Sequence, residues 1–184
     1  MDNPTTQFKQ VLDFWFVESE PKQWFNGGEA FDEVIKSRFT DLLAQAIAGE
    51  LHHWRLFGQG RLAEVIILDQ FSRNIYRGNA HAFAQDPQAL TLAQEAVAMG
   101  TLEQLTPVEQ AFLLMPYMHS ESRHIHELAV PLFKQYGEPS NYEFELKHKS
   151  IIDKFGRYPH RNAILGRESS AEELAFLQQP DSSF

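Results

Sequence analysis

The stretch LAEVIILDQFSRNIYR, residues 62–77, decides the fold class, because it contains the run that most resembles a β-strand, VIIL at 65–68. That run is short, and it lies within a longer segment in which Leu62, Ile66 and Asp69 recur at helical spacing. An Arg-Gly-Asn turn signal follows the segment and is expected to end the helix. No other segment alternates apolar and polar residues over the length of a strand, so the sequence predicts an all-α protein.

Helical spacing extends to both sides of this stretch. Apolar stripes predict one helix from about Thr6 to Val17 and another from Phe31 to a C-terminal turn at Gly49. Later helices begin with N-cap signals, in which a side-chain oxygen accepts a hydrogen bond from a backbone N–H that has no partner inside the helix. These signals begin at Asp86, Thr106, Ser140 and Ser169.

Short connections between the predicted helices indicate stacked antiparallel neighbours in one domain, residues 1–184. Pro116 and Pro131 fall inside apolar helical stretches, where proline removes a backbone donor, so each predicts a kink or a helix boundary. The last helix is expected to bury Leu174, and Phe144 is expected on the apolar face of the helix before it.

The composition excludes several classes of function. The formal charge of −9 would repel nucleic-acid phosphates, so we expect no nucleic-acid partner. The chain contains no Cys, which excludes disulfides and thiolate chemistry. No apolar run approaches the roughly 18 residues that span a membrane, and no secretory signal is recognisable, so we expect a cytoplasmic protein without membrane association. Metal motifs and Gly-rich phosphate loops are missing, so we expect no metal and no cofactor.

Residues 147–167, KHKSIIDKFGRYPHRNAILGR, form a basic segment within this acidic chain. They hold six of the sixteen Lys and Arg residues and one acid, a formal charge of +5. Within six residues the segment brings together Arg157, His160, Arg161 and Asn162. Arginine offers a planar fork of donors for carboxylate or phosphate, and histidine can hold or move a proton, so these residues predict an anion site. The alternative is that Arg157 complements the negative C-terminal end of the preceding helix and that Arg161 pairs with surface acids.

Segment 69–77 is the second candidate. The i, i+4 spacing places Asp69 beside Arg73 and Arg73 beside Arg77 on one helical face, with Asn74 next to them. Because two like charges four residues apart repel, we consider an anion shared by Arg73 and Arg77, or a bridge from Asp69 to a distant base. The alternative is a solvated Asp69–Arg73 pair.

The remaining candidates are histidines. His119 with Glu121 could form a general base with its orienting acid, or a helix start in which Ser120 is the cap and Glu121 lies in the first turn. His148 lies on an apolar helix face and is expected to be a buried, hydrogen-bonded residue. His126 is expected to be an exposed helix residue.

Three motifs resemble a bacterial family catalogued as domain of unknown function 924: LDQFSRNIYRG, MPYMHSE and FGRYPHRNAILGRESSAEELAFL. The resemblance implies an all-α fold similar to tetratricopeptide-repeat proteins, with stacked antiparallel helices but without the repeat consensus. It implies no biochemical activity. The motif residues that match best are Asp69, Gln70, Arg73, Asn74, His119, Glu121, Gly156, Arg157, Pro159, His160, Arg161 and Asn162.

The leading hypothesis is a helical protein that binds a small anionic metabolite or a carboxylate-bearing peptide in a polar pocket. The predicted ligand-binding residues are Asp69, Arg73, Asn74, Arg157, His160, Arg161 and Asn162. The alternative is a metal-independent hydrolase or lyase that uses His119 or His160 as acid/base, with Glu121 or Asp69 orienting it. A third hypothesis is a scaffold that binds protein partners through a concave helical surface. A homodimer, a common state of soluble proteins, is compatible with each of them.

Overall fold

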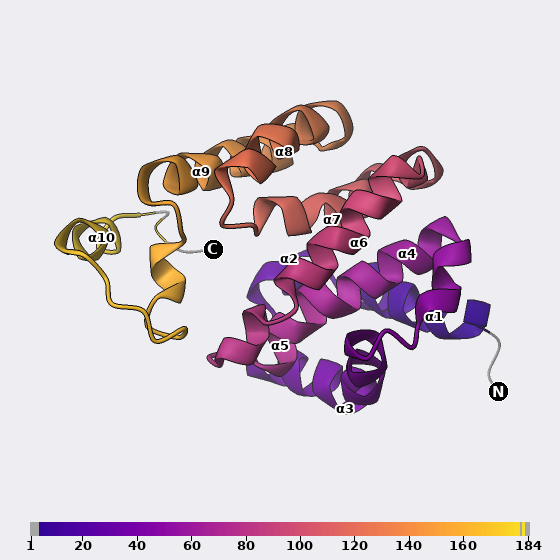
Figure 1. Cartoon of the computed structure of the whole chain (residues 1–184). Helices are drawn as coiled ribbons and strands as arrows, with labels where there is room; N and C mark the ends of the chain where they lie inside the picture. The colour runs from indigo at the N-terminus through magenta and orange to yellow at the C-terminus, as the bar shows by residue number, and fades with distance from the viewer. Residues whose placement is uncertain (1–3, 181, 183–184) are drawn as a thin grey trace.

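The computed structural model describes residues 4–180 and 182, and within them the chain forms helices and no strand. The all-α prediction is therefore confirmed, while the ends of the predicted domain, residues 1–184, lie outside the described residues. The α-helices of Figure 1 are α1 (Pro4–Asp13), α2 (Pro21–Asn26), α3 (Gly28–Ile47), α4 (Gly58–Ile66), α5 (Ser72–Ile75), α6 (Asp86–Ala98), α7 (Pro107–Met118), α8 (Arg123–Tyr136), α9 (Pro139–Phe155) and α10 (Ala171–Phe176).

The stretch that decided the fold class is helical from Leu62 to Ile75 and ends in a turn. A wider π-helical turn, Ile67–Phe71, joins α4 to α5, and all five residues of this turn are buried. The VIIL run is therefore the end of α4 and the start of the π turn, where burial on every side explains its continuous apolar character. Single π turns inside α-helices occur frequently at functional sites, and this one contains Asp69.

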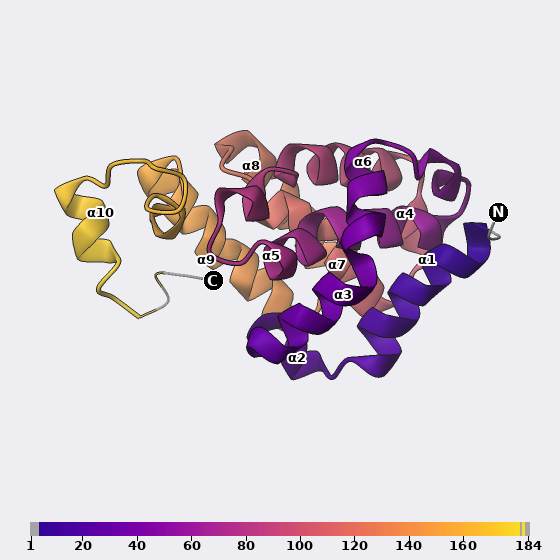
Figure 2. The same cartoon turned by 90° about the horizontal axis from the view of Figure 1, so that it is seen from below.

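Each later helix packs against the next along the chain, with α6 on α7, α7 on α8 and α8 on α9. Figure 1 shows α8 and α9 side by side at the top and α10 set apart at the left, beyond the end of α9. Figure 2, seen from below, shows the same separation of α10 from the helices that surround α4 and α7. The similarity to tetratricopeptide-repeat proteins that the family resemblance implies, a right-handed array of stacked helices, remains a prediction.

The core is rich in aromatic side chains. Trp15 is fully buried and packs edge-on against Phe71 and Phe112, with ring centroids 5.5 and 5.6 Å apart. A second, small apolar cluster lies under the segment after α9 and contains Ile152 and Tyr158, both fully buried. Burial of Tyr158 fixes the position of that segment against the helices.

Local signals placed some helix ends correctly. The capping box of α7 is present as predicted, and Gly156 ends α9 in the left-handed conformation at φ 70°. The predicted start at Ser140 is wrong, because α9 begins at Pro139 with Glu138 as its N-cap.

No helix boundary lies at Pro116 or Pro131, because α7 and α8 continue through them, and a kink at either proline remains a prediction. Two burial predictions also fail, since Phe144 is 47% and Leu174 55% exposed. None of the described helices is long and apolar enough to cross a membrane.

Candidate functional site

A buried carboxylate and a histidine from distant segments form a hydrogen-bonded pair. Asp69, in the π turn, is fully buried, and its Oδ1 lies 2.8 Å from Nδ1 of His119, which follows α7. Gln70 donates from Nε2 to Oδ2 of Asp69 at 2.6 Å, and Arg73 Nη1 lies 3.2 Å from Oδ1. The bridge from Asp69 to a distant base, considered from the sequence, therefore exists, and its base is His119.

The electrostatics of this pair fix its protonation. Burial alone would raise the pKa of Asp69, but the positive charge of Arg73 and the bond from His119 hold that pKa well below its usual value. Burial lowers the pKa of His119, and Asp69 opposes only part of that effect. At neutral pH the pair is thus a carboxylate and a neutral imidazole whose Nδ1–H donates to Asp69. The lone pair of the imidazole then lies on Nε2.

Two arginines from opposite parts of the chain bind the same carboxylate oxygen. Oδ2 of Asp86 lies 3.0 Å from Arg73 Nη2 and 3.1 Å from Arg161 Nη1. Both guanidinium groups stand over the ring of Phe83, at 5.6 and 4.6 Å from its centroid. Segments 69–73 and 157–162 therefore meet at Asp86, the first residue of α6.

Arg161 is 6% exposed, and its Nε has no hydrogen-bond partner among the described residues. Its guanidinium lies 4.7 Å from the ring centroid of Tyr158, which supports the arginine from one side. The buried Nε is closed to a ligand, and a buried donor without a partner costs about 1–3 kcal/mol. Nη2 of Arg161 is the nitrogen open to a ligand, since it is neither hydrogen-bonded to a described residue nor buried.

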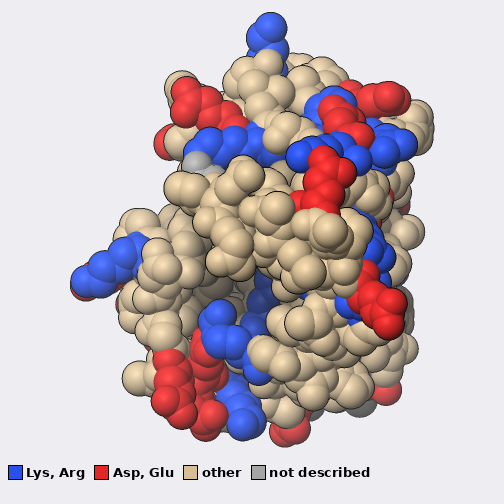
Figure 3. All heavy atoms as spheres, turned by 90° about the vertical axis from the view of Figure 1, so that its left-hand side faces the viewer, with Lys and Arg blue, Asp and Glu red and all other residues tan. Residues whose placement is uncertain are grey.

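His160 lies next to Tyr158, on the same segment as Arg161. It is partly buried, and its ring centroid is 5.6 Å from that of Tyr158. Burial lowers the pKa of His160 to about 4, and the charge of Arg161 adds to this effect, so the ring is neutral at neutral pH. Figure 3, which views the α10 side, shows a hollow in the surface with Lys or Arg atoms inside it.

Other predicted site residues take structural roles in a second network beside the first. Arg157 binds Glu173 through two nitrogens, at 2.7 and 2.9 Å, and thereby ties the loop to α10. Asn162 donates to Ser169 Oγ at 3.0 Å.

Glu121 is likewise separate from His119. It accepts two hydrogen bonds from Arg167, at 2.6 and 2.9 Å, and one from the backbone N–H of Tyr158 at 2.7 Å. Glu121 therefore anchors the backbone of the loop that carries His160 and Arg161.

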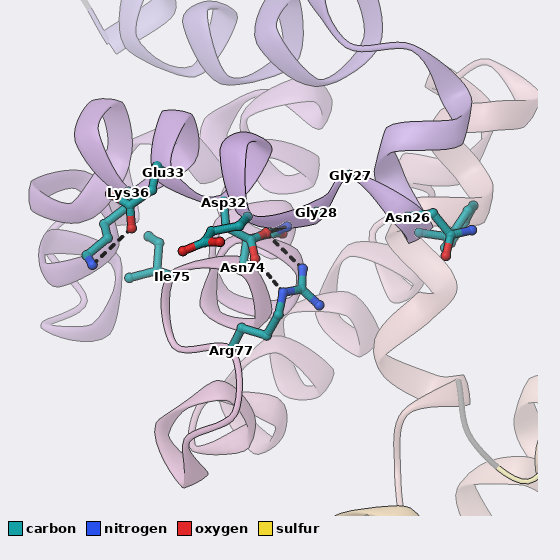
Figure 4. A pocket seen from close by; sticks show the side chains of 11 residues that line it. Asn26, Gly27, Gly28, Asp32, Glu33, Lys36, Asn74, Ile75 and Arg77 are labelled. Atoms are coloured by element: carbon teal, nitrogen blue, oxygen red, sulfur yellow. Dashed lines mark hydrogen bonds and ion pairs between the residues drawn. The ribbon is translucent and has the colours of Figure 1, made fainter.

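Asn74 points away from Arg73. It donates to Asp32 Oδ1 at 2.8 Å, and Arg77 binds the same carboxylate through Nε and Nη2. Arg73 and Arg77 therefore bind different acids and share no anion. Figure 4 shows this network in a cavity of about 630 Å³ between α2, α3 and α5, lined by Phe25, Asn26, Gly27, Gly28, Glu29, Asp32, Glu33, Lys36, Asn74, Ile75 and Arg77.

A buried histidine behind the site was not expected from the sequence. His126 and Glu145 are both fully buried, with 2.7 Å between Nδ1 and Oε1. His126 Nε2 lies 2.9 Å from the carbonyl oxygen of Ser120 and 3.2 Å from Tyr158 Oη. The prediction that His126 is exposed is wrong, because α8 turns this face towards α9. His148 is buried as expected, 2.8 Å from the carbonyl oxygen of Phe144.

Sequence reasoning missed Asp86, Phe83 and Tyr158. Asp86 precedes a proline, and this signal pointed to an N-cap, whereas its side chain binds the two arginines. No described group of three or more His, Asp or Glu side chains is arranged to hold a metal ion.

The comparisons with known proteins agree with this fold. The family described as "Bacterial protein of unknown function (DUF924)" matches residues 11–181. A solved structure of a protein of unknown function from Agrobacterium tumefaciens has a TM-score of 0.91 and 34% identity, over 96% of this chain and 99% of that chain. No curated protein matches the chain significantly.

Proposed function

The chain belongs to this bacterial family of unknown function, and we propose that it binds a small carboxylate-bearing anion at Arg73 and Arg161. The observation that carries the proposal is the convergence of both guanidinium groups on one oxygen of Asp86, which leaves Nη2 of Arg161 open and without a partner among the described residues. The bonds of Arg73 and Arg161 to the carboxylate of Asp86 show how the two guanidinium groups can hold a carboxylate oxygen.

The net charge of the side chains around Asp86 favours a ligand of low charge. Arg73 and Arg161 carry two positive charges, Asp69 and Asp86 carry two negative ones, and His119 is neutral. A monovalent carboxylate would bind by charge-assisted hydrogen bonds in partly desolvated surroundings, where such bonds are about twice as strong as neutral ones. A multiply charged anion would leave negative charge uncompensated.

The exposure of the group favours a small ligand or the end of a chain. The side chains of Arg73 and His119 are 20% and 17% exposed, and that of Arg161 is 7% exposed. A free carboxylate, or the C-terminal carboxylate of a peptide, can therefore reach these donors, whereas a continuous polypeptide surface cannot. This supports the first hypothesis over a scaffold that binds proteins through this face.

Thermal unfolding in the presence of acetate and propionate, which carry one negative charge, and of phosphate, which carries more, tests the proposal. At about a hundred times its Kd a ligand stabilises the fold by about 2.7 kcal/mol, which raises the Tm of a chain of this size by about 5–10 °C. We expect Arg161→Gln to abolish this rise for the carboxylates. Arg38→Gln is the matched control, because Arg38 forms a surface pair with Glu18.

The proposal fails if Arg161→Gln is folded and still responds to acetate as the wild type does. It also fails if neither carboxylate raises the Tm of the wild type. A variant that is unfolded without ligand would be replaced by Arg73→Lys, which retains the charge and removes the planar fork of donors.

A further inference from the structure

We infer that this site hydrolyses carboxylic esters, with His119 as the general base that activates a water molecule. The inference rests on the proposed function, because the product of such a reaction is the carboxylate that Arg73 and Arg161 would bind. Its geometric basis is the Asp69–His119 pair, in which one ring nitrogen is held at 2.8 Å from a buried carboxylate.

The pair has the arrangement that a base requires. None of the described residues hydrogen-bonds Nε2 of His119, and the side chain is 17% exposed, so water can reach it. Gln70 and Arg73 hold both oxygens of Asp69, which fixes the carboxylate and through it the imidazole ring. A carboxylate in this position sets the tautomer and stabilises the imidazolium that forms during proton transfer.

Water is the nucleophile, because the nearby hydroxyl groups are unsuitable. Ser72, three residues after Asp69, is fully buried. Ser120, next to His119, accepts a hydrogen bond from the backbone N–H of Ser122 at 3.2 Å. Neither side chain shows a hydrogen bond to His119 within the part of the chain that the structure describes.

The reaction proceeds in two balanced steps. In the first, Nε2 of His119 takes a proton from water while the water oxygen bonds to the acyl carbon, and the carbonyl electron pair moves onto its oxygen. In the second, this pair re-forms the carbonyl, the bond to the alcohol oxygen breaks, and the leaving oxygen takes the proton from the imidazolium. The guanidinium of Arg161 is the donor available to the oxyanion, since its Nη2 is neither hydrogen-bonded to a described residue nor buried.

The near-neutral charge of the group favours an ester over a phosphate monoester. A phosphate monoester brings two negative charges beside Asp69 and Asp86, whereas an ester brings none and forms one as it becomes a carboxylate. Stabilisation therefore increases along the reaction, as catalysis requires.

The pH profile gives a readout that a structural histidine would not change. The charged groups that act on His119 are Asp69, Arg73 and Asp86, and His160 is a further titratable neighbour. Burial lowers the pKa of His119, so the base form persists below the usual histidine range. We expect kcat/KM to stay constant from neutral pH downwards and to fall only below about pH 6.5, the ordinary pKa of histidine.

Hydrolysis of p-nitrophenyl acetate by the full-length chain tests the inference. We expect His119→Gln to lower the rate by about 100-fold or more, the usual contribution of a general base. His124→Gln is the matched control, because the ring of His124 is 74% exposed and reacts with the ester only as any surface imidazole does. Equal rates for the two variants would overturn the inference.

Two further measurements separate the possible failures. If His119→Gln hydrolyses the ester as fast as the wild type but is still stabilised by acetate, the hydrolase is refuted and the anion site stands. If His119→Gln does not fold, the wild type is treated with diethyl pyrocarbonate, and the modified histidines are located by mass spectrometry. We then expect loss of hydrolysis to follow modification of His119, and acetate to slow both the modification and the loss. Hydrolysis that survives modification of His119 overturns the inference.

Discussion

Replacing Glu145 by glutamine should remove a pH dependence of stability that the buried His126–Glu145 pair creates. His126 Nε2 lies 2.9 Å from the carbonyl oxygen of Ser120, which can only accept, so Nε2 carries a hydrogen. Nδ1 lies 2.7 Å from Oε1 of Glu145, and that contact also needs a hydrogen. One proton must therefore lie between Nδ1 and Oε1, on either atom.

The sign of the effect follows from this shared proton. Burial raises the pKa of Glu145, and His126 opposes only part of the rise. A group whose folded pKa is raised stabilises the fold fully below its unfolded pKa, and this stabilisation is lost as the pH rises through the folded pKa. Because an unfolded chain has released both protons a little above about pH 6.5, unfolding releases one proton at higher pH.

The magnitude is that of one proton. The free energy of unfolding should fall by about 1.4 kcal/mol for each pH unit, or about 2.5–3 kcal/mol between about pH 7 and pH 9. Glutamine at the same position donates from its amide to the neutral ring and needs no extra proton. Glu145→Gln should therefore gain about 2.5–3 kcal/mol over the wild type across this interval.

Urea unfolding of the two proteins at about pH 7 and pH 9 measures the difference, with equal m-values showing that the same transition is observed. Glu143→Gln is the control, since Glu143 is exposed on the same helix and should change little at either pH. A difference between wild type and Glu145→Gln that is the same at both pH values would show that no proton is shared.

Three further substitutions test the other structural assignments by urea unfolding. Asn74→Ala should cost about 1–3 kcal/mol, because it leaves the buried Asp32 short of a donor, but should leave acetate binding unchanged; lost binding would return Asn74 to the anion site. Tyr158→Phe removes the hydroxyl that donates to the carbonyl oxygen of Met118 at 2.5 Å and should cost about 1–3 kcal/mol, whereas a neutral result would mean that another donor reaches that oxygen. Gly156→Ala should cost about 1 kcal/mol through φ 70° alone, because the added Cβ meets only one atom, at 3.9 Å; a larger loss would indicate a clash.

The helices were predictable because their signals are local. Spacing, the Thr106 capping box and the glycine at 156 act within one or two turns, so the sequence contains the whole cause. Pro116 failed as a boundary signal because α7 is buried along most of its length, and tertiary packing outweighs the loss of one backbone hydrogen bond.

The site was predictable only in part, because its contacts join segments that are far apart. The hypothesis that Asp69 bridges to a distant base could be made without knowledge of the packing. The identity of that base could not be predicted, because His119 is fifty residues away. Arg73 and Arg77 were paired by helical spacing, yet α5 ends at Ile75, so Arg77 is free to bind another acid. Spacing rules hold only inside the helix to which they are applied.

The energetic character of the central network also bears on its role. Replacement of buried ion pairs by well-packed apolar side chains is often neutral or stabilising, so the group formed by Arg73, Asp86 and Arg161 is weak evidence for stability. In a fold with this aromatic core, apolar side chains could occupy the space of these three residues. The neighbouring pair of Asp69 and His119 strengthens the argument, because Nε2 of its neutral imidazole hydrogen-bonds no described residue and the side chain is 17% exposed. Selection for the binding and chemistry that we propose would account for an ion network of little stabilising value beside such a pair, whereas selection for stability alone would not.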